Sequence, residues 1–189
     1  SAALTARPLA NVVLEVASGN LAEVSVSPAL LTFTTANWDT PQFVTVAGVN
    51  DNPATVDGSQ AVTVTVSVND AASDDAWDPL ASQTVSVTNL DDDSAGFALS
   101  KTAVTVSESG TSETFTVVLT ARPLSAVVFE VSSANADQAT ATPAQLSFSP
   151  AAWNTPQTVT VAGVDDFRLD GSQTTTVTVS VNDALSNDA

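Results

Sequence analysis

Residues 174–181 read Thr-Thr-Thr-Val-Thr-Val-Ser-Val, which is the most regular alternation of apolar and polar side chains in the chain. Successive side chains of a β-strand point to opposite faces, so Val177, Val179 and Val181 share one face and hydroxyl groups occupy the other. The pattern predicts a strand that packs one face against a core and leaves the other in solvent.

Similar segments recur along the chain, separated by Gly, Pro, Asn, Asp and Ser residues that are typical of turns. The further strands that we expect are residues 83–89, 97–106, 113–120, 127–132 and 157–164, with a short one around Leu146 and Phe148. The chain is rich in Val, Thr and Ser, which favour strands. About seven short strands at this spacing predict an all-β fold of immunoglobulin-like β-sandwiches.

Two parts of the chain repeat each other at an offset of 115 residues. The segment Thr5–Leu9 returns as Thr120–Leu124, and 26 of 45 positions are identical between residues 5–49 and residues 120–164. Shared composition does not produce so many identities in register. The chain is therefore interpreted as a tandem duplication.

Neither copy is expected to be whole. Residues 1–93 form the first repeat, which lacks its N-terminal strands, and residues 94–189 form the second, which lacks its last strand. Asp57-Gly58 matches Asp170-Gly171 at an offset of 113, because the first copy carries two extra residues before this point. We expect the chain to be a window on a longer array in which neighbouring repeats, of the same chain or of identical chains, are partners.

The composition excludes several classes of function. Four basic residues stand against 21 acidic ones, and the net charge of −17 opposes binding to nucleic acid or to anionic membranes. No apolar run approaches the roughly 20 residues of a membrane span. His and Cys are absent, which removes the usual general base and thiol nucleophile. Carboxylates alone serve glycosidases, but these acids lie in repeated loops without an aromatic cleft, so we expect no enzyme.

Asp91, Asp92 and Asp93 stand side by side at the junction of the repeats. Two like charges at about 4 Å repel by ~1 kcal/mol in water and by ~4 kcal/mol at an effective dielectric constant of ~20. The chain has few cations to offset this repulsion. A bound divalent cation and a solvated acidic linker are the two interpretations that stay open.

Other acids are expected at the same end of each sandwich, because loops between strands fall alternately at its two ends. Hard Ca²⁺ takes six to eight oxygen ligands, which converging acidic loops supply. The Asp-Gly pairs are equally typical of tight turns. The candidate Ca²⁺ ligands are Asp51, Asp57, Asp91, Asp92, Asp93, Glu108, Asp165, Asp166 and Asp170.

Three motifs together resemble the Calx-β domain and its bacterial tandem-repeat relatives, over the whole chain. They are Val106-Ser107-Glu108, Val164-Asp165-Asp166 followed by Asp170, and Val87 to Asp93. The resemblance implies calcium at this end of the sandwich. The chain departs from the family where Gln173 and Gln60 replace a second glutamate, so we expect weak sites with a Kd on the order of 10⁻⁴ to 10⁻³ M.

The tryptophans and the repetition suggest roles for the chain. Trp38 and Trp153 occupy equivalent positions and are expected to close the end of each core, with a sugar-stacking surface as the alternative. Trp77, in a long acidic loop, is the better candidate for an exposed contact. We expect a calcium-stiffened rod or fibre that spaces an adhesive region of a secreted or cell-surface protein. The alternatives are a module that binds a glycan or a cell-surface protein, and an extracellular filament subunit that assembles through incomplete sandwich ends.

Overall fold

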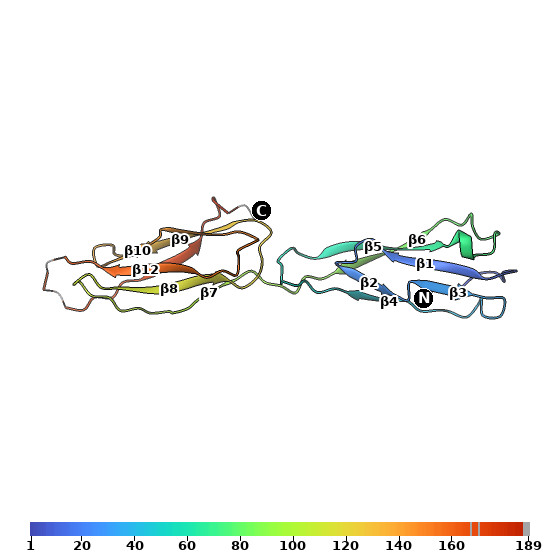
Figure 1. Ribbon diagram of the computed structural model, residues 1–189, viewed down its shortest axis with the longest axis horizontal. Coiled ribbons are helices and arrows are strands. Elements are labelled where there is room, and N and C mark those ends of the chain that lie inside the picture. The colour runs from blue at the N-terminus through green and yellow to red at the C-terminus, as the bar shows by residue number, and fades with distance from the viewer. Residues whose placement is uncertain (167, 170, 187–189) are drawn as a thin grey trace. The chain divides into compact units, whose positions relative to one another are not determined.

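The computed structural model describes residues 1–166, 168–169 and 171–186 of the chain. Its regular structure consists of antiparallel β-sheets and one short 3-10 helix (Figure 1). Among the described residues, no helix has the length and apolar character that crossing a membrane requires. The chain is therefore all-β, as its alternating sequence predicts.

The chain divides into two compact units, each built from two separate segments of the sequence. Unit 1 comprises Ser1–Asn52 and Gly58–Asp92, and unit 2 comprises Pro53–Asp57 and Asp93–Ala189. The backbone therefore passes between the units three times instead of once.

Unit 1 contains six strands in two antiparallel sheets. One sheet has the order β3-β1-β5-β6, and the other pairs β2 with β4. The elements are β1 (Val12–Ser18), β2 (Val24–Ser27), β3 (Leu30–Phe33), β4 (Thr45–Gly48), β5 (Gln60–Val68), the 3-10 helix η1 (Asp70–Ala72) and β6 (Gln83–Asn89). Their inward side chains form one apolar core, in which Val12, Val24 and Phe33 are fully buried.

The described part of unit 2 contains seven strands, also in two antiparallel sheets. One sheet has the order β10-β12-β8-β7 and the other the order β11-β9-β13. The strands are β7 (Phe97–Leu99), β8 (Ser112–Leu119), β9 (Val127–Ser133), β10 (Ala139–Thr142), β11 (Gln145–Phe148), β12 (Gln157–Gly163) and β13 (Val177–Val181). The core includes Val117, Phe129, Phe148 and Val159. Two sheets around one core in each unit are consistent with a β-sandwich.

Equivalent strands recur at the offset found in the sequence. The bounds of β9, β10 and β11 equal those of β1, β2 and β3 with 115 added to each number. The buried Phe148 corresponds to the buried Phe33 in the same way. The repeated sequence thus produces the same strands in both units.

The units differ where a neighbouring strand is present in one and absent from the other. In unit 1 β6 pairs with β5 along seven positions, and β5 is nine residues long. In unit 2 the equivalent strand β13 has only five residues, so the expected start at Thr174 is wrong by three residues. An extended segment needs a hydrogen-bonded neighbour to become part of a sheet, and β13 has such a neighbour, β9, on one side only.

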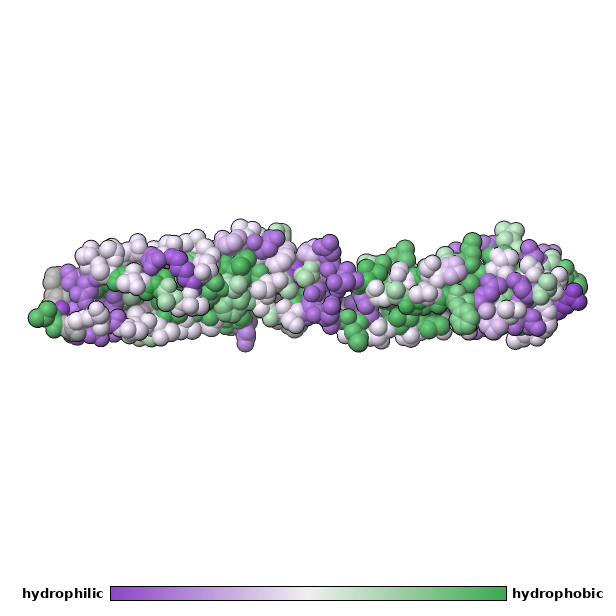
Figure 2. All heavy atoms as spheres, turned by 90° about the horizontal axis from the view of Figure 1, so that it is seen from below, coloured by the Kyte–Doolittle hydropathy of each residue, from purple (hydrophilic) through white to green (hydrophobic). Residues whose placement is uncertain are grey.

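The converse difference concerns β4 of unit 1. In unit 2 the equivalent strand β12 pairs with β8, and Val161 is 2% exposed. In unit 1 Val46 occupies the equivalent position and is 39% exposed, and Phe43 is 75% exposed. Figure 2 shows hydrophobic surface over the part of unit 1 in which β4 lies. These apolar side chains are exposed because β4 pairs with β2 alone among the described strands, so no neighbouring strand covers its other edge.

Two further strand predictions need correction. The strand expected at residues 97–106 forms only as β7, Phe97–Leu99. The short strands β2 and β10 were not predicted: β10 reads Ala-Thr-Ala-Thr, which carries little apolar signal, and the alternation of β2 covers only four residues. β2 and β10 pair with β4 and β12, and each contributes one buried side chain to its core, Val24 and Ala139 respectively.

The tryptophans pack against the cores. Trp38 lies against the core of unit 1 and Trp153 against that of unit 2, as their equivalent positions predict. Trp77 is also partly buried against the core of unit 1. Its ring is therefore engaged in packing, which weakens the interpretation of Trp77 as an exposed contact.

Candidate functional site

In unit 1 the acidic triplet accepts a hydrogen bond from the loop between β4 and β5. The Gly58 N–H donates a hydrogen bond of 2.8 Å to Oδ2 of Asp91. Gly58 has a φ of +74°, a conformation that favours glycine and turns its N–H toward the carboxylate. Asp51 and Asp91 are half-buried, whereas Asp92 is exposed. Asp91 is thus part of the loop's hydrogen bonding, a use that the sequence interpretation did not foresee.

In unit 2 the last carboxylate of the triplet has a similar partner. The Thr55 N–H donates a 2.8 Å hydrogen bond to Oδ2 of Asp93. Thr55 also forms a parallel bridge with Arg122, whose N–H donates to the Ala54 carbonyl at 2.8 Å and whose carbonyl accepts from the Val56 N–H at 3.1 Å. Residues 53–57, including the half-buried Asp57, therefore belong to unit 2 through backbone hydrogen bonds.

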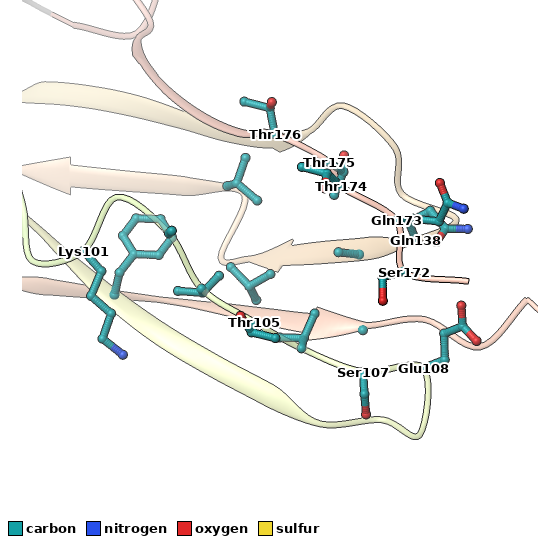
Figure 3. A pocket seen from close by; sticks show the side chains of 18 of the residues that line it. Lys101, Thr105, Ser107, Glu108, Gln138, Ser172, Gln173, Thr174, Thr175 and Thr176 are labelled. Carbon is teal, nitrogen blue, oxygen red and sulfur yellow. The ribbon is translucent and has the colours of Figure 1, made fainter. Parts of the chain in front are cut away.

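The acids of the second copy lie near one end of unit 2. Asp166 accepts from Nε2 of Gln138 at 2.9 Å and from the Arg168 N–H at 3.0 Å. Figure 3 shows Glu108 near Ser172, Gln173 and Gln138, at the same end of a cavity. The predicted convergence of the loop at residue 108 with the loop after β12 is therefore present in unit 2. Asp165 is exposed, and the candidate Asp170 lies outside the described residues.

The candidate ligands do not form a ready-made metal site in the described part of the chain. No group of three or more acidic residues placed to hold a metal ion occurs there. The carboxylates of Asp91, Asp93 and Asp166 point instead toward N–H donors of nearby loops. The calcium site therefore stays a prediction, with ligands that would have to exchange or share these hydrogen bonds.

An amide side chain that was not predicted from the sequence joins three segments of unit 1. Nδ2 of Asn89 donates to Oε2 of Glu23 at 3.0 Å and to the Val49 carbonyl at 2.9 Å. Asn89 ends β6, so these bonds join the last strand to the loops that follow β1 and β4. The signal in the sequence was the polar Asn two positions after Val87, on the face of β6 that packs against the core.

A second acidic cluster, which the sequence analysis placed in a loop with Trp77, contains two carboxyls with opposite pKa shifts. Hydrogen bonds from the N–H groups of Ala10, Ala76 and Leu9 lower the pKa of Asp74. Desolvation raises the pKa of Asp78, and the charges of Asp70 and Asp75 raise it further. Oδ1 of Asp78 is shielded from solvent and has no hydrogen-bond partner among the described residues.

These shifts predict opposite effects of two isosteric substitutions. Asp74→Asn should destabilise unit 1 at neutral pH, because a lowered pKa means that the folded state favours the carboxylate. That stabilisation is present above the unfolded pKa, near 3.8, and is lost as the pH falls through the lower folded value. Asp78→Asn should stabilise unit 1 at neutral pH, because it removes a disfavoured charge. Urea denaturation between pH 7 and pH 3 measures both, and equal effects of the two variants would contradict the assignment.

The fold and these loops define an all-β chain of antiparallel sheets, consistent with a β-sandwich. No protein-family model matches the chain, and no curated protein matches it significantly. The likeness to Calx-β domains therefore rests on the three motifs quoted from the sequence.

Proposed function

We propose that this chain is a structural repeat segment of a secreted or cell-surface protein, built of tandem immunoglobulin-like sandwiches of Calx-β type. The observation that carries the proposal is the recurrence of the same strands at a fixed offset, with the backbone passing three times between the units. A tandem array of one repeated unit suits a segment that sets a distance, because each copy adds the same structural unit.

Calcium is the second part of the proposal. The acids Asp91, Asp92 and Asp93 lie where the chain leaves unit 1 for unit 2. A bound Ca²⁺ would offset their mutual repulsion and hold the acidic loops together. The weak affinity expected of such a site matches the millimolar calcium of extracellular fluids.

A calorimetric titration with Ca²⁺ tests this part. Wild-type protein is expected to bind with a Kd on the order of 10⁻⁴ to 10⁻³ M. Asp92→Asn should weaken binding by about threefold or more, because affinity depends on the number of charged ligands. This substitution keeps the hydrogen bonds of Asp91 and Asp93 with the loop.

The matched control is Asp39→Asn, which removes the same charge from an exposed position away from the candidate loops. Its affinity should equal that of the wild type. If Asp39→Asn weakens calcium binding as much as Asp92→Asn does, the effect comes from the net charge of the protein and not from a local site. The absence of binding heat at several millimolar Ca²⁺ would remove calcium from the proposal.

One alternative function, a filament subunit that assembles through incomplete sandwich ends, is favoured by specific observations. They are the apolar edge of β4, where Val46 is exposed, and the one-sided pairing of β13. The glycan- or protein-binding alternative has less support because Trp77 packs against the core.

A further inference from the structure

One edge of β13 carries no neighbouring strand in the described part of unit 2. Its other edge pairs with β9, with Val179 opposite Val131. In unit 1 the equivalent strand β5 lies between β1 and β6 and is paired on both sides. An open edge exposes a row of unsatisfied N–H and C=O groups, which is a template for a further strand.

A cavity of about 920 Å³ lies beside this open edge. Figure 3 shows Thr105 and Ser107 on one side of it and Thr174, Thr175 and Thr176 on the other. Its lining includes an apolar set from both sheets and from the segment after β7: Val104, Val106, Phe115, Val161, Val177 and Val179. The core of unit 2 is therefore open along one side, next to an edge that can accept hydrogen bonds.

The segment on the other side of the cavity is extended but belongs to no sheet. The Thr105 N–H donates to Oε2 of Glu113 at 3.0 Å, and the Ser107 N–H donates to Oγ1 of Thr111 at 2.7 Å. These N–H groups are thus satisfied by side chains of unit 2 and not by a strand. The sequence predicts a strand through residue 106, and a neighbour in the cavity would supply its missing partner.

We propose that this cavity is the acceptor site for one β-strand of the sequence type of β6, contributed by polypeptide outside residues 1–189. The strand inserts antiparallel to β13, between β13 and the segment at residues 101–107. In unit 1 Val85 pairs with Val64 and Val87 with Val62. At the offset of 113, the equivalent residues of the inserted strand lie opposite Val177 and Thr175.

The repeat identifies the occupant. β6 reads Gln-Thr-Val-Ser-Val-Thr-Asn, without a charge, and places Val87 against the core of unit 1. A strand with small apolar residues at alternate positions fits a slot that has apolar walls on one face and solvent on the other. A second copy of residues 1–189 does not supply it, because β6 of each copy already pairs with β5. The inference rests on the proposed repeat architecture alone, and calcium plays no part in it.

The test extends the chain after Ala189 with a copy of residues 77–93, in EDTA. Ala189 corresponds to Ala76, so the extension places the added strand at the spacing that β6 has from β5 in unit 1. A tether of this length provides an effective concentration in the millimolar range. Hydrogen exchange of the backbone amides of residues 173–179 should slow by about tenfold or more relative to the unextended chain.

Two control extensions carry equal charge on opposite faces of the added strand. Asp in place of the copy of Val87 should abolish the protection, because Val87 packs against the core of unit 1. Asp in place of the copy of Ser86, which is exposed in unit 1, should preserve it. A labelled peptide of residues 82–90 added to the unextended chain should protect the same amides.

Three results would overturn the proposal. They are unchanged exchange at residues 173–179 in the extended chain, equal protection by both control extensions, and protection confined to residues 60–68. Dimerisation of the unextended chain that protects residues 173–179 would assign the site to a second copy instead, against the proposal. Loss of calcium binding leaves all of these readouts intact, so the two proposals fail separately.

Discussion

Phe148→Ala is expected to lower the free energy of unfolding of unit 2 by about 3–5 kcal/mol, the cost of truncating a fully buried aromatic side chain. Phe148 is completely buried in β11 and meets Phe129 edge to face, with ring centroids 5.8 Å apart. Such a loss approaches the whole stability of a domain of this size, so unit 2 should be partly unfolded at room temperature.

Hydrogen exchange resolved by peptide measures this loss, with Phe33→Ala as the matched control. Phe33 is equally buried at the equivalent position of unit 1, but Leu14 stands where unit 2 has Phe129. Phe148→Ala should remove protection from β9 and leave β1 protected, and Phe33→Ala should do the reverse. Loss of protection in both units from either variant would contradict separate cores.

Gly163→Ala is expected to destabilise unit 2 by about 1–3 kcal/mol through overpacking. A Cβ at Gly163 would overlap the backbone of Ser107, whose carbonyl carbon would lie 2.7 Å away. Backbone atoms cannot move aside without moving the segment that leads to Glu108. The substitution therefore disturbs both β12 and the end of unit 2 at which the acidic loops meet.

Gly48→Ala is the control, because Gly48 holds the equivalent position in unit 1. There a Cβ would meet only the side-chain amide of Asn89. That amide can rotate, although it then loses its hydrogen bonds with Glu23 and Val49. The midpoint of thermal unfolding should therefore fall less for Gly48→Ala than for Gly163→Ala. An equal fall for both variants would show that the close approach of Ser107 is not the cause.

The strands of this fold were predictable wherever apolar and polar residues alternate. Residues 83–89 match β6 at both ends, and residues 113–120 match β8 to within one residue at each end. Alternation predicted the wrong start for β13, because the length of a strand also depends on its hydrogen-bonded neighbours. Residues 174–176 have the composition of a strand but no neighbouring strand on one side, and β13 begins at Val177. A strand is a property of two segments, and a single sequence shows only one of them.

The candidate site was less predictable than the fold. Repetition identified loops that lie at one end of unit 2, where Glu108 and the loop containing Asp166 approach each other. It could not reveal that Asp91 and Asp93 accept hydrogen bonds from Gly58 and Thr55, because those bonds depend on the backbone path of a loop. Nor did it reveal Asn89, whose two acceptors are 66 and 40 residues away in sequence.

The acidic triplet consequently has a structural role that does not require a metal. Its outer carboxylates fix the loop between β4 and β5, and the exposed Asp92 lies between them. If Ca²⁺ binds as proposed, it adds to an existing set of hydrogen bonds and limits how the units move.

Small-angle X-ray scattering of the chain in EDTA and in millimolar Ca²⁺ tests the central claim most directly. Calcium is expected to narrow the distribution of interatomic distances between the units. Asp92→Asn should shift this change to higher calcium concentrations, and Asp39→Asn should not. Scattering profiles that superimpose in EDTA and in calcium would contradict a calcium-stiffened repeat segment.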